Sequence, residues 1–321
     1  MTVDAIHAKA ARLGVLAVSL LLLAGSGTGP GAAEAQPGAA AIGLRVVRLV
    51  DTTRTLRLPD GRHAPRTLLT YIRYPADGPP GATDLPDAPV ARETAPRPLI
   101  VFIHGFAVTP AIYSRLLQSW TRAGYIVAAP VFPLESAGAP GGPDEADLVN
   151  EPSDVSFVIS QLLSGAAAPS LASALDSTRI AVAGQSDGGE AALAVGYSRS
   201  FHDPRVGAAV VLSGARMSGV GGFHFGPGSP PLLAVQGTAD PINAPRYTYA
   251  YFRSARRPKF LLRLLGAEHL PPYTTEQPQL GIVERVSEAF LDTFLGLHPE
   301  RLAGLISLGN VRGTAALQAE P

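Results

Sequence analysis

The sequence predicts an α/β fold in which helices cover both faces of a mostly parallel, doubly wound sheet. Three observations favour this class. From residue 44 onward, short apolar runs alternate with longer segments of helical periodicity. The run PLIVFIHG, residues 98–105, is continuously apolar and ends at a glycine, as expected for a strand buried on both faces. The strand and helix patterns also follow one another repeatedly, which is typical of parallel strands joined by crossovers.

The bulk composition agrees with one folded globular domain. The chain has 321 residues, of which 46% are hydrophobic and 16% charged, and its formal net charge is zero. Equal numbers of basic and acidic residues leave no summed field that would attract a nucleic acid or an anionic membrane, so neither is an expected partner. The absence of cysteine excludes a disulfide framework and a lipid-modified N-terminal cysteine.

The first 35 residues follow the pattern of a secretory signal peptide. Basic residues precede an apolar run at residues 13–25, and Ala33-Glu34-Ala35 forms a small-x-small cleavage site. The run is shorter than the roughly 18 apolar residues of a spanning helix, although an uncleaved membrane anchor is the alternative. We therefore expect a secreted protein, without stable membrane insertion after cleavage, whose residues 36–321 form a single domain.

The opening segments predict a hairpin followed by the first core strand and helix. Residues 43–58 and 66–76 are expected to form an antiparallel pair, and the proline-rich residues 77–97 an exposed connection. After the strand at residues 98–105, residues 110–124 predict a helix with a proline near its start and a glycine at its end. The expected apolar face of this helix consists of Ile112, Leu116, Leu117 and Trp120.

The rest of the chain continues the alternation. Residues 125–133 predict a strand and residues 151–165 a helix, with Ser153 or Asp154 as its N-cap. The apolar face of that helix consists of Val155, Val158, Ile159 and Leu162. Four more strands are expected at residues 179–184, 205–214, 230–237 and 259–266, and two more helices at residues 187–200 and 281–296.

A nucleophile motif lies between one of these strands and the next helix. Residues 184–188 read Gly-Gln-Ser-Asp-Gly, and a strand-turn-helix setting is the context in which G-x-S-x-G forms a nucleophile elbow. Side chains at Gly184 and Gly188 would collide across such a turn. The glycines therefore indicate that Ser186 is strained and its hydroxyl presented above the sheet.

A serine hydroxyl needs a base and a group that orients the base. His269 follows the last expected strand, where its loop could reach Ser186. Asp240 follows the strand at residues 230–237, and the order serine, acid, histidine is the one used by nucleophile-elbow enzymes. Asp292 and Glu268 remain the alternatives for the acid.

Acyl transfer also requires donors for the developing oxyanion. The backbone N–H groups of Asp187 and Phe106 are the candidates, whereas we interpret His104 as structural. The carboxylate of Asp187 is unexpected beside a site that accumulates negative charge, and it requires an offsetting partner. Arg216 is a candidate for that partner.

These residues resemble the α/β-hydrolase superfamily over about residues 44–297. The motifs RYPA, HGF and EPSDVSFVISQLL resemble a secreted bacterial group related to dienelactone hydrolases, platelet-activating-factor acetylhydrolases and cutinase-like polyester hydrolases. The resemblance implies an α/β-hydrolase fold with Ser186 as nucleophile, Asp240 as acid and His269 as base, and with Phe106 and Asp187 in the oxyanion hole. The connection at residues 215–230 is too short and glycine-rich for a helical cap, so an open site is expected.

The sequence therefore predicts a secreted serine carboxylester hydrolase that works through an acyl-enzyme. The substrate would be a small-molecule or lipid-like ester, and no metal or organic cofactor is expected. The alternatives are an acyltransferase of the cell envelope, a lipase or cutinase-like polyester hydrolase, and a non-catalytic binding module. Four aromatic residues are candidates for lining an acyl groove: Phe106, Phe223, Phe225 and Tyr273.

Overall fold

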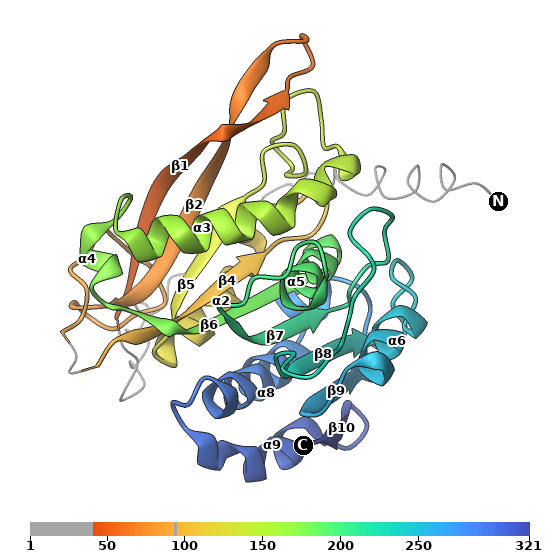
Figure 1. The fold of residues 1–321 in the computed structure, drawn as a ribbon. Coiled ribbons are helices and arrows are strands. Elements are labelled where there is room, and N and C mark those ends of the chain that lie inside the picture. Colours follow the sequence, from red (N-terminus) through yellow and green to blue (C-terminus); the bar gives the residue numbers. More distant parts are fainter. Residues whose placement is uncertain (1–40, 93–94) are drawn as a thin grey trace, which may run out of the picture. The chain divides into compact units, whose positions relative to one another are not determined.

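The structure is a computed structural model that describes residues 41–92 and 95–321, which belong to one compact unit, Pro37–Pro321 (Figure 1). The predicted signal peptide, residues 1–35, lies outside the described residues and stays a prediction. Among the described residues, no helix has the length and apolar character needed to cross a membrane.

Within the described residues, ten strands form one mixed sheet in the order β10-β9-β8-β7-β6-β4-β5-β2-β1-β3. The strands are β1 (Ala41–Arg57), β2 (His63–Ala76), β3 (Leu85–Pro86), β4 (Arg97–Ile103), β5 (Ile126–Val131), β6 (Leu175–Gln185), β7 (Val206–Leu212), β8 (Leu232–Gly237), β9 (Lys259–Leu264) and β10 (Ala315–Glu320).

The middle of the sheet is parallel, and antiparallel pairs flank it on both sides, with the short β3 parallel to β1 at one edge. Strands β5, β4, β6, β7, β8 and β9 pair in parallel. The expected opening hairpin is confirmed as β1 and β2, and β2 joins the sheet antiparallel to β5. The carboxyl ends of parallel strands meet at one edge, so the loops after β4, β6, β8 and β9 gather there.

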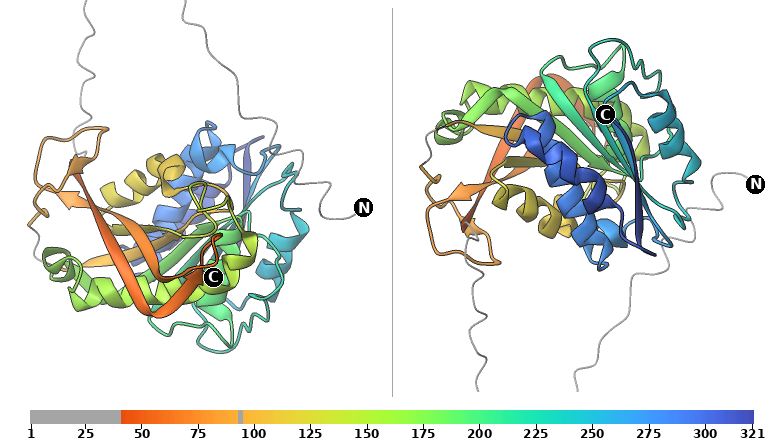
Figure 2. Two further views of the ribbon diagram at one scale, coloured as in Figure 1. Left: turned by 90° about the horizontal axis from the view of Figure 1, so that it is seen from above. Right: turned by 90° about the horizontal axis from the view of Figure 1, so that it is seen from below.

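Helices cover both faces of the sheet, as predicted (Figure 2). Residues of α3, α5 and α6 pack in the core on one face, and residues of α2, α8 and α9 pack in the core on the other. The helical segments are η1 (Pro110–Tyr113), α2 (Ser114–Arg122), η2 (Glu145–Asn150), α3 (Glu151–Ser164), α4 (Pro169–Ala172), α5 (Asp187–Tyr197), α6 (Arg246–Ser254), α7 (Pro271–Thr274), α8 (Gln279–Phe294), η3 (Pro299–Arg301) and α9 (Leu302–Gly309).

Two local predictions are wrong. Ile112 does not share the buried face of α2; it is 39% exposed, because it lies in the 3₁₀ turn η1, whose periodicity differs from that of an α-helix. Neither Ser153 nor Asp154 caps α3, which begins at Glu151 directly after η2. The predicted apolar face of α3 is confirmed, since Val155, Val158, Ile159 and Leu162 are all buried.

Asp154 instead belongs to a buried ion-pair cluster that joins the hairpin to the helical layer. Arg66 of β2 pairs with Asp147 of η2 at 2.6 Å and with Asp154 of α3 at 2.7 Å. Arg54 of β1 also reaches Asp154, at 2.7 Å. Burial alone would lower the pKa of Arg66, but the hydrogen bonds that it donates to the two aspartates raise it, so the guanidinium is held charged.

Removing this arginine is expected to be costly. Arg66→Met should lower the free energy of unfolding by about 3–5 kcal/mol, because it leaves two buried carboxylates without their main counter-ion. Urea unfolding followed by circular dichroism measures the change. Arg62→Met is the matched control, since Arg62 forms an exposed pair with Asp60, and its unfolding should be nearly unchanged. Equal losses in both variants would contradict the assignment.

Candidate active site

Ser186 occupies a strained turn between β6 and α5. Its φ is 58° and its ψ is −121°, which is a conformation that non-glycine residues rarely adopt. Hydrogen bonds on both sides hold it. The Ser186 N–H donates to the carbonyl of Leu212 at 2.9 Å, and the Ser186 carbonyl accepts from the N–H of Ala215 at 3.0 Å. The elbow predicted from the motif is therefore present in the backbone.

The two flanking glycines are required by close backbone contacts. A Cβ atom at Gly184 would lie 2.0 Å from the carbonyl oxygen of Gly188, which is the collision expected across the turn. A Cβ atom at Gly188 would meet a different neighbour, the carbonyl oxygen of Ile103 at the end of β4, at 2.2 Å. Both contacts are with backbone atoms, which cannot move without breaking the sheet or the turn.

A matched pair of glycine variants tests this packing. Gly188→Ala should lower the free energy of unfolding by about 3 kcal/mol, the upper part of the range for overpacked sites. Gly196→Ala, on the same helix, meets no atom closer than 3.7 Å and should change it by less than about 1 kcal/mol. Thermal unfolding of both proteins provides the comparison, and similar melting temperatures would contradict the role given to Gly188.

Three side chains from distant parts of the chain meet at this turn. His269, in the loop after β9, places Nε2 3.0 Å from Ser186 Oγ and Nδ1 2.8 Å from Asp240 Oδ2. Asp240 is in the loop after β8, so the three residues follow β6, β8 and β9 at the same carboxyl edge of the sheet. An Nδ1–H that donates to Asp240 leaves the lone pair of Nε2 facing the serine hydroxyl.

Asp240 is fixed by several donors besides His269. Oδ1 accepts from the backbone N–H groups of Ile242 and Asn243, each at 2.9 Å, and Oδ2 accepts from Gln236 Nε2 at 3.0 Å. Burial acts to raise the pKa of Asp240, but the hydrogen bond and the charge of His269, with the backbone donors, bring it below its ordinary value. The carboxylate therefore stays charged beside the imidazole.

The structure adds two contact residues that the sequence analysis missed. Asn243 Nδ2 donates to Ser186 Oγ at 3.3 Å and to the carbonyl of Ser213 at 2.8 Å. Gln185 Nε2 lies 3.2 Å from both Nε2 and the carbonyl oxygen of His269. The only sequence signal for either is adjacency: Gln185 is part of the elbow motif, and Asn243 follows Asp240 by three residues.

The two candidate oxyanion donors flank Ser186. Asp187 is the first residue of α5, and N–H groups in the first turn of a helix have no partner within the helix. The loop that carries Phe106 lies against the serine, since a Cβ atom at the preceding Gly105 would be 3.0 Å from Ser186 Cβ. The main chain turns at once after Phe106, where Ala107 has a φ of 56°.

His104 has a structural environment, in agreement with its interpretation from the sequence. The side chain is fully buried, its Nε2 accepts from the backbone N–H of Phe132 at 3.2 Å, and its Nδ1 lies 2.8 Å from the Gly105 carbonyl oxygen. Burial lowers the pKa of His104 to about 4, so the ring is neutral and holds β4 to the segment after β5.

Arg216 does not offset the charge of Asp187. Its guanidinium lies over the ring of Tyr247, 5.9 Å from the centroid. The Asp187 side chain is instead buried against Glu135, and burial followed by the charge of Glu135 raises its pKa to about 8. The predicted arginine partner is thus wrong, and the carboxyl group is protonated near neutral pH.

The four aromatic candidates lie in three different environments. Tyr273 is fully buried and its hydroxyl lies 2.8 Å from Ser213 Oγ, so it is a core residue and not a groove residue. Phe223 and Phe225 line a pocket of about 710 Å³ that also includes Arg216 and Glu190. This pocket adjoins the elbow, because Arg216 follows Ala215, which binds the Ser186 carbonyl. Phe106 is half-buried.

No helix lies in the connection between β7 and β8, as expected for a site without a cap. Ser186 is nevertheless only 8% exposed to solvent, and the side chain of His269 is only 15% exposed. Irregular loops, not a helical lid, therefore form the walls of the site. Within the described ranges, no group of three or more His, Asp or Glu side chains is arranged to hold a metal ion.

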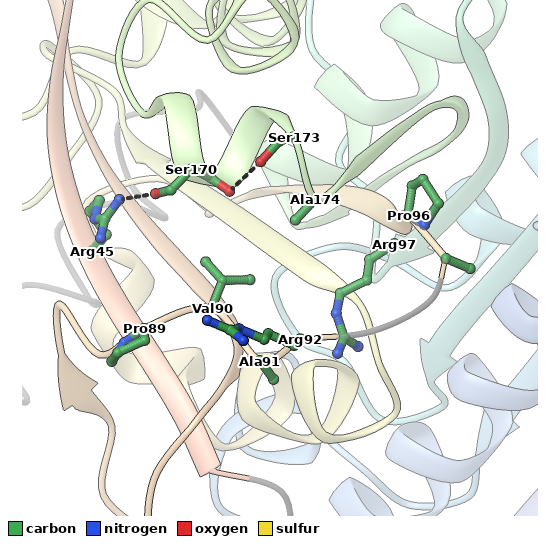
Figure 3. Close-up of a pocket in the computed structure, with 11 residues that line it drawn as sticks. Arg45, Pro89, Val90, Ala91, Arg92, Pro96, Arg97, Ser170, Ser173 and Ala174 are labelled. Atoms are coloured by element: carbon green, nitrogen blue, oxygen red, sulfur yellow. Dashed lines mark hydrogen bonds between the residues drawn. The ribbon is translucent and has the colours of Figure 1, made fainter.

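Another pocket, of about 730 Å³, lies away from these residues (Figure 3). Arg45 of β1 and Arg97 at the amino end of β4 line it, and Arg45 donates to Ser170 of α4 at 2.8 Å. Since the amino ends of parallel strands face away from the reactive edge, this pocket does not contribute to the site at Ser186.

The parallel sheet, its strand order and the elbow after β6 define an α/β-hydrolase fold. Residues 88–212 match the protein-family model described as Chlorophyllase, a range that includes Ser186 but neither Asp240 nor His269. Among solved structures, a ferulic acid esterase from Streptomyces cinnamoneus is similar, with a TM-score of 0.59 and 22% sequence identity. The alignment covers 83% of this chain and 92% of that chain. No curated protein matches the sequence.

Proposed function

We propose that the protein is a serine esterase that cleaves carboxylic esters through an acyl-enzyme. The observation that carries this proposal is the hydrogen-bonded series Ser186–His269–Asp240 at a strained elbow. The match to the Chlorophyllase family model and the likeness to a ferulic acid esterase indicate a carboxylester hydrolase.

Each member of the series has a chemical role. Ser186 Oγ attacks the ester carbonyl while His269 Nε2 takes its proton, and Asp240 stabilises the resulting imidazolium. His269 then returns the proton to the leaving alcohol. A water molecule, deprotonated by His269, attacks the acyl-enzyme and releases the acid.

The oxyanion of each tetrahedral intermediate would bind to the N–H groups of Asp187 and Phe106. Each such donor contributes about 3 kcal/mol to transition-state stabilisation. The pocket lined by Phe223 and Phe225 begins at Arg216, one residue beyond Ala215, whose N–H binds the Ser186 carbonyl. We place the acyl or alcohol group of the ester in this pocket. Secretion remains part of the proposal and rests on the pattern of residues 1–35.

An acyltransferase would use the same residues, with an alcohol in place of water. No helix in the connection between β7 and β8 covers the site and restricts the acceptor to water. An added acceptor alcohol separates the two: transfer that outruns hydrolysis would identify a transferase.

Covalent labelling and a substrate series test the esterase proposal. Diisopropyl fluorophosphate should add one phosphoryl group at Ser186, located by peptide mass spectrometry, and abolish hydrolysis of nitrophenyl esters. Acetyl, butyryl, octanoyl and feruloyl esters compared at equal concentration then define the acyl group. Labelling at other serines with full retention of activity would overturn the proposal.

A further inference from the structure

Three carboxyl groups lie together in the protein interior beside the proposed nucleophile. Glu135 is in the loop after β5, Glu151 is the first residue of α3, and Asp187 is the first residue of α5. Their exposures are 0%, 0% and 4%. The carboxyl group of Glu135 is within hydrogen-bonding reach of both Glu151 and Asp187.

The oxygen atoms of this carboxyl cluster, Glu135, Glu151 and Asp187, face one another instead of donors. All four carboxyl oxygens of the two glutamates, and Oδ2 of Asp187, are buried and receive no hydrogen bond from any N–H or O–H of the described residues. Ionised carboxylates only accept hydrogen bonds, so contact between two of them requires a proton on one. A proton shared between the carboxyl groups meets this requirement.

The surroundings of the cluster favour the protonated form. The charged or titratable groups that act on the cluster are Glu145 and Asp147 of η2, Asp154 of α3 and His269. Asp187 in turn acts on Tyr113 of η1 and Glu190 of α5. Burial raises the pKa values of Glu135 and Glu151. The charge of Glu135 raises the pKa of Glu151 further, and the charges of Asp147 and Glu145 act in the same direction on Glu135. The imidazole of His269 is the group that favours the charged form of Asp187.

Glu135 also joins the two segments that carry the candidate oxyanion donors. Its backbone carbonyl accepts from the N–H of Ala107 at 2.9 Å, immediately after Phe106. Its side chain contacts Asp187, which supplies the other donor. A charge on this cluster would therefore act on both sides of the place where negative charge develops during the reaction.

We propose that Glu135, Glu151 and Asp187 form a proton-sharing cluster that positions the oxyanion donors and keeps the Asp187 side chain uncharged while the ester reacts. This inference rests on the proposed esterase function. The three side chains are positioning residues, because they act through the backbone N–H groups of the Asp187 and Phe106 segments.

The pH dependence of kcat separates this role from simple packing. The parent protein should lose activity on the alkaline side with a midpoint near pH 8, as Asp187 ionises. One pH unit above the midpoint, about a tenth of the maximal rate should remain. In Asp187→Asn, with each profile scaled to its own maximum, the alkaline decrease should disappear, because an amide cannot ionise.

Glu135→Gln should keep the alkaline decrease in activity but change the pH at its midpoint. Removing the charge of Glu135 removes a cause of the raised Asp187 pKa, and the new amide can donate to the ionised Asp187, so the midpoint should shift to lower pH. Glu276→Gln removes a half-buried carboxylate outside the cluster and should leave the profile of the parent unchanged.

Thermal unfolding provides a readout that does not need catalysis. The native state binds the Asp187 proton more tightly than the unfolded chain, so the stability of the parent should fall as pH rises from about 4 toward about 8. Asp187→Asn should flatten this decrease and melt above the parent at about pH 9.

The outcomes are distinguishable. If hydrolysis depends on Ser186 but Asp187→Asn keeps the alkaline decrease of the parent, the cluster inference is overturned and the esterase proposal stands. If Asp187→Asn does not fold, the Glu135→Gln shift decides, and an unchanged or raised midpoint overturns the inference. Hydrolysis that is unaffected by loss of Ser186 rejects the esterase proposal, whereas the melting curves still test proton sharing.

Discussion

Ser186→Ala is expected to lower kcat for a short-chain nitrophenyl ester by about 10⁴-fold or more, the scale seen when a triad nucleophile is removed. The reason is that no acyl-enzyme can form without Oγ. Residual turnover would come from binding and from oxyanion stabilisation alone. Steady-state kinetics on purified protein, with circular dichroism as a check of folding, measure the loss.

Ser307→Ala is the matched control. Ser307 is on α9, exposed, and its hydroxyl donates only to the Gly304 carbonyl one turn away. Its removal should leave kcat unchanged. If the Ser186 variant retained the activity of the control, the serine mechanism would be excluded and a non-catalytic role would regain support.

Asp240→Asn is expected to reduce kcat by about 10⁴-fold while leaving the fold intact. An asparagine at this position can donate to Nδ1 of His269, which favours the tautomer with the proton on Nε2. That proton faces Ser186 Oγ, where a lone pair is needed to accept the hydroxyl proton. The loss should appear in kcat more than in KM, because the ester does not contact Asp240.

Asp292→Asn supplies the control for this variant, because Asp292 was the alternative acid. In the structure Asp292 accepts from the hydroxyl of Tyr125 at 2.5 Å and pairs with Arg301 at 2.7 Å. It does not contact His269, so kcat should be nearly unchanged. A large loss in Asp292→Asn with little effect of Asp240→Asn would reverse the assignment.

The elbow and its two partners could be predicted because their signals are local. Each of Ser186, Asp240 and His269 lies within five residues of the end of an apolar strand, and the carboxyl ends of parallel strands lie at one edge. Chain order alone then predicts that they approach. The glycine at position 184 is also a local signal, because the clash that it avoids is with the backbone of Gly188, four residues later.

The features that were missed depend on contacts between distant segments. Glu135 and Glu151 have no pattern that relates them to Asp187, and only the packing of the segment after β5 and of α3 against α5 brings them together. Tyr273 is an aromatic residue of a type that often lines a groove, but it is packed into the core. The helix α6 was missed because its sequence, RYTYAYFRS, is rich in tyrosine, whose helix propensity is low.

The left-handed backbone at Ser186 lowers the stability of the protein but is needed for its reactivity. A residue held at φ 58° costs conformational energy that the surrounding sheet must supply, and any change that relaxes it also moves Oγ out of line with the imidazole. Efforts to make this protein more heat-resistant should therefore leave the elbow alone and act on distant positions, such as the exposed hairpin loop.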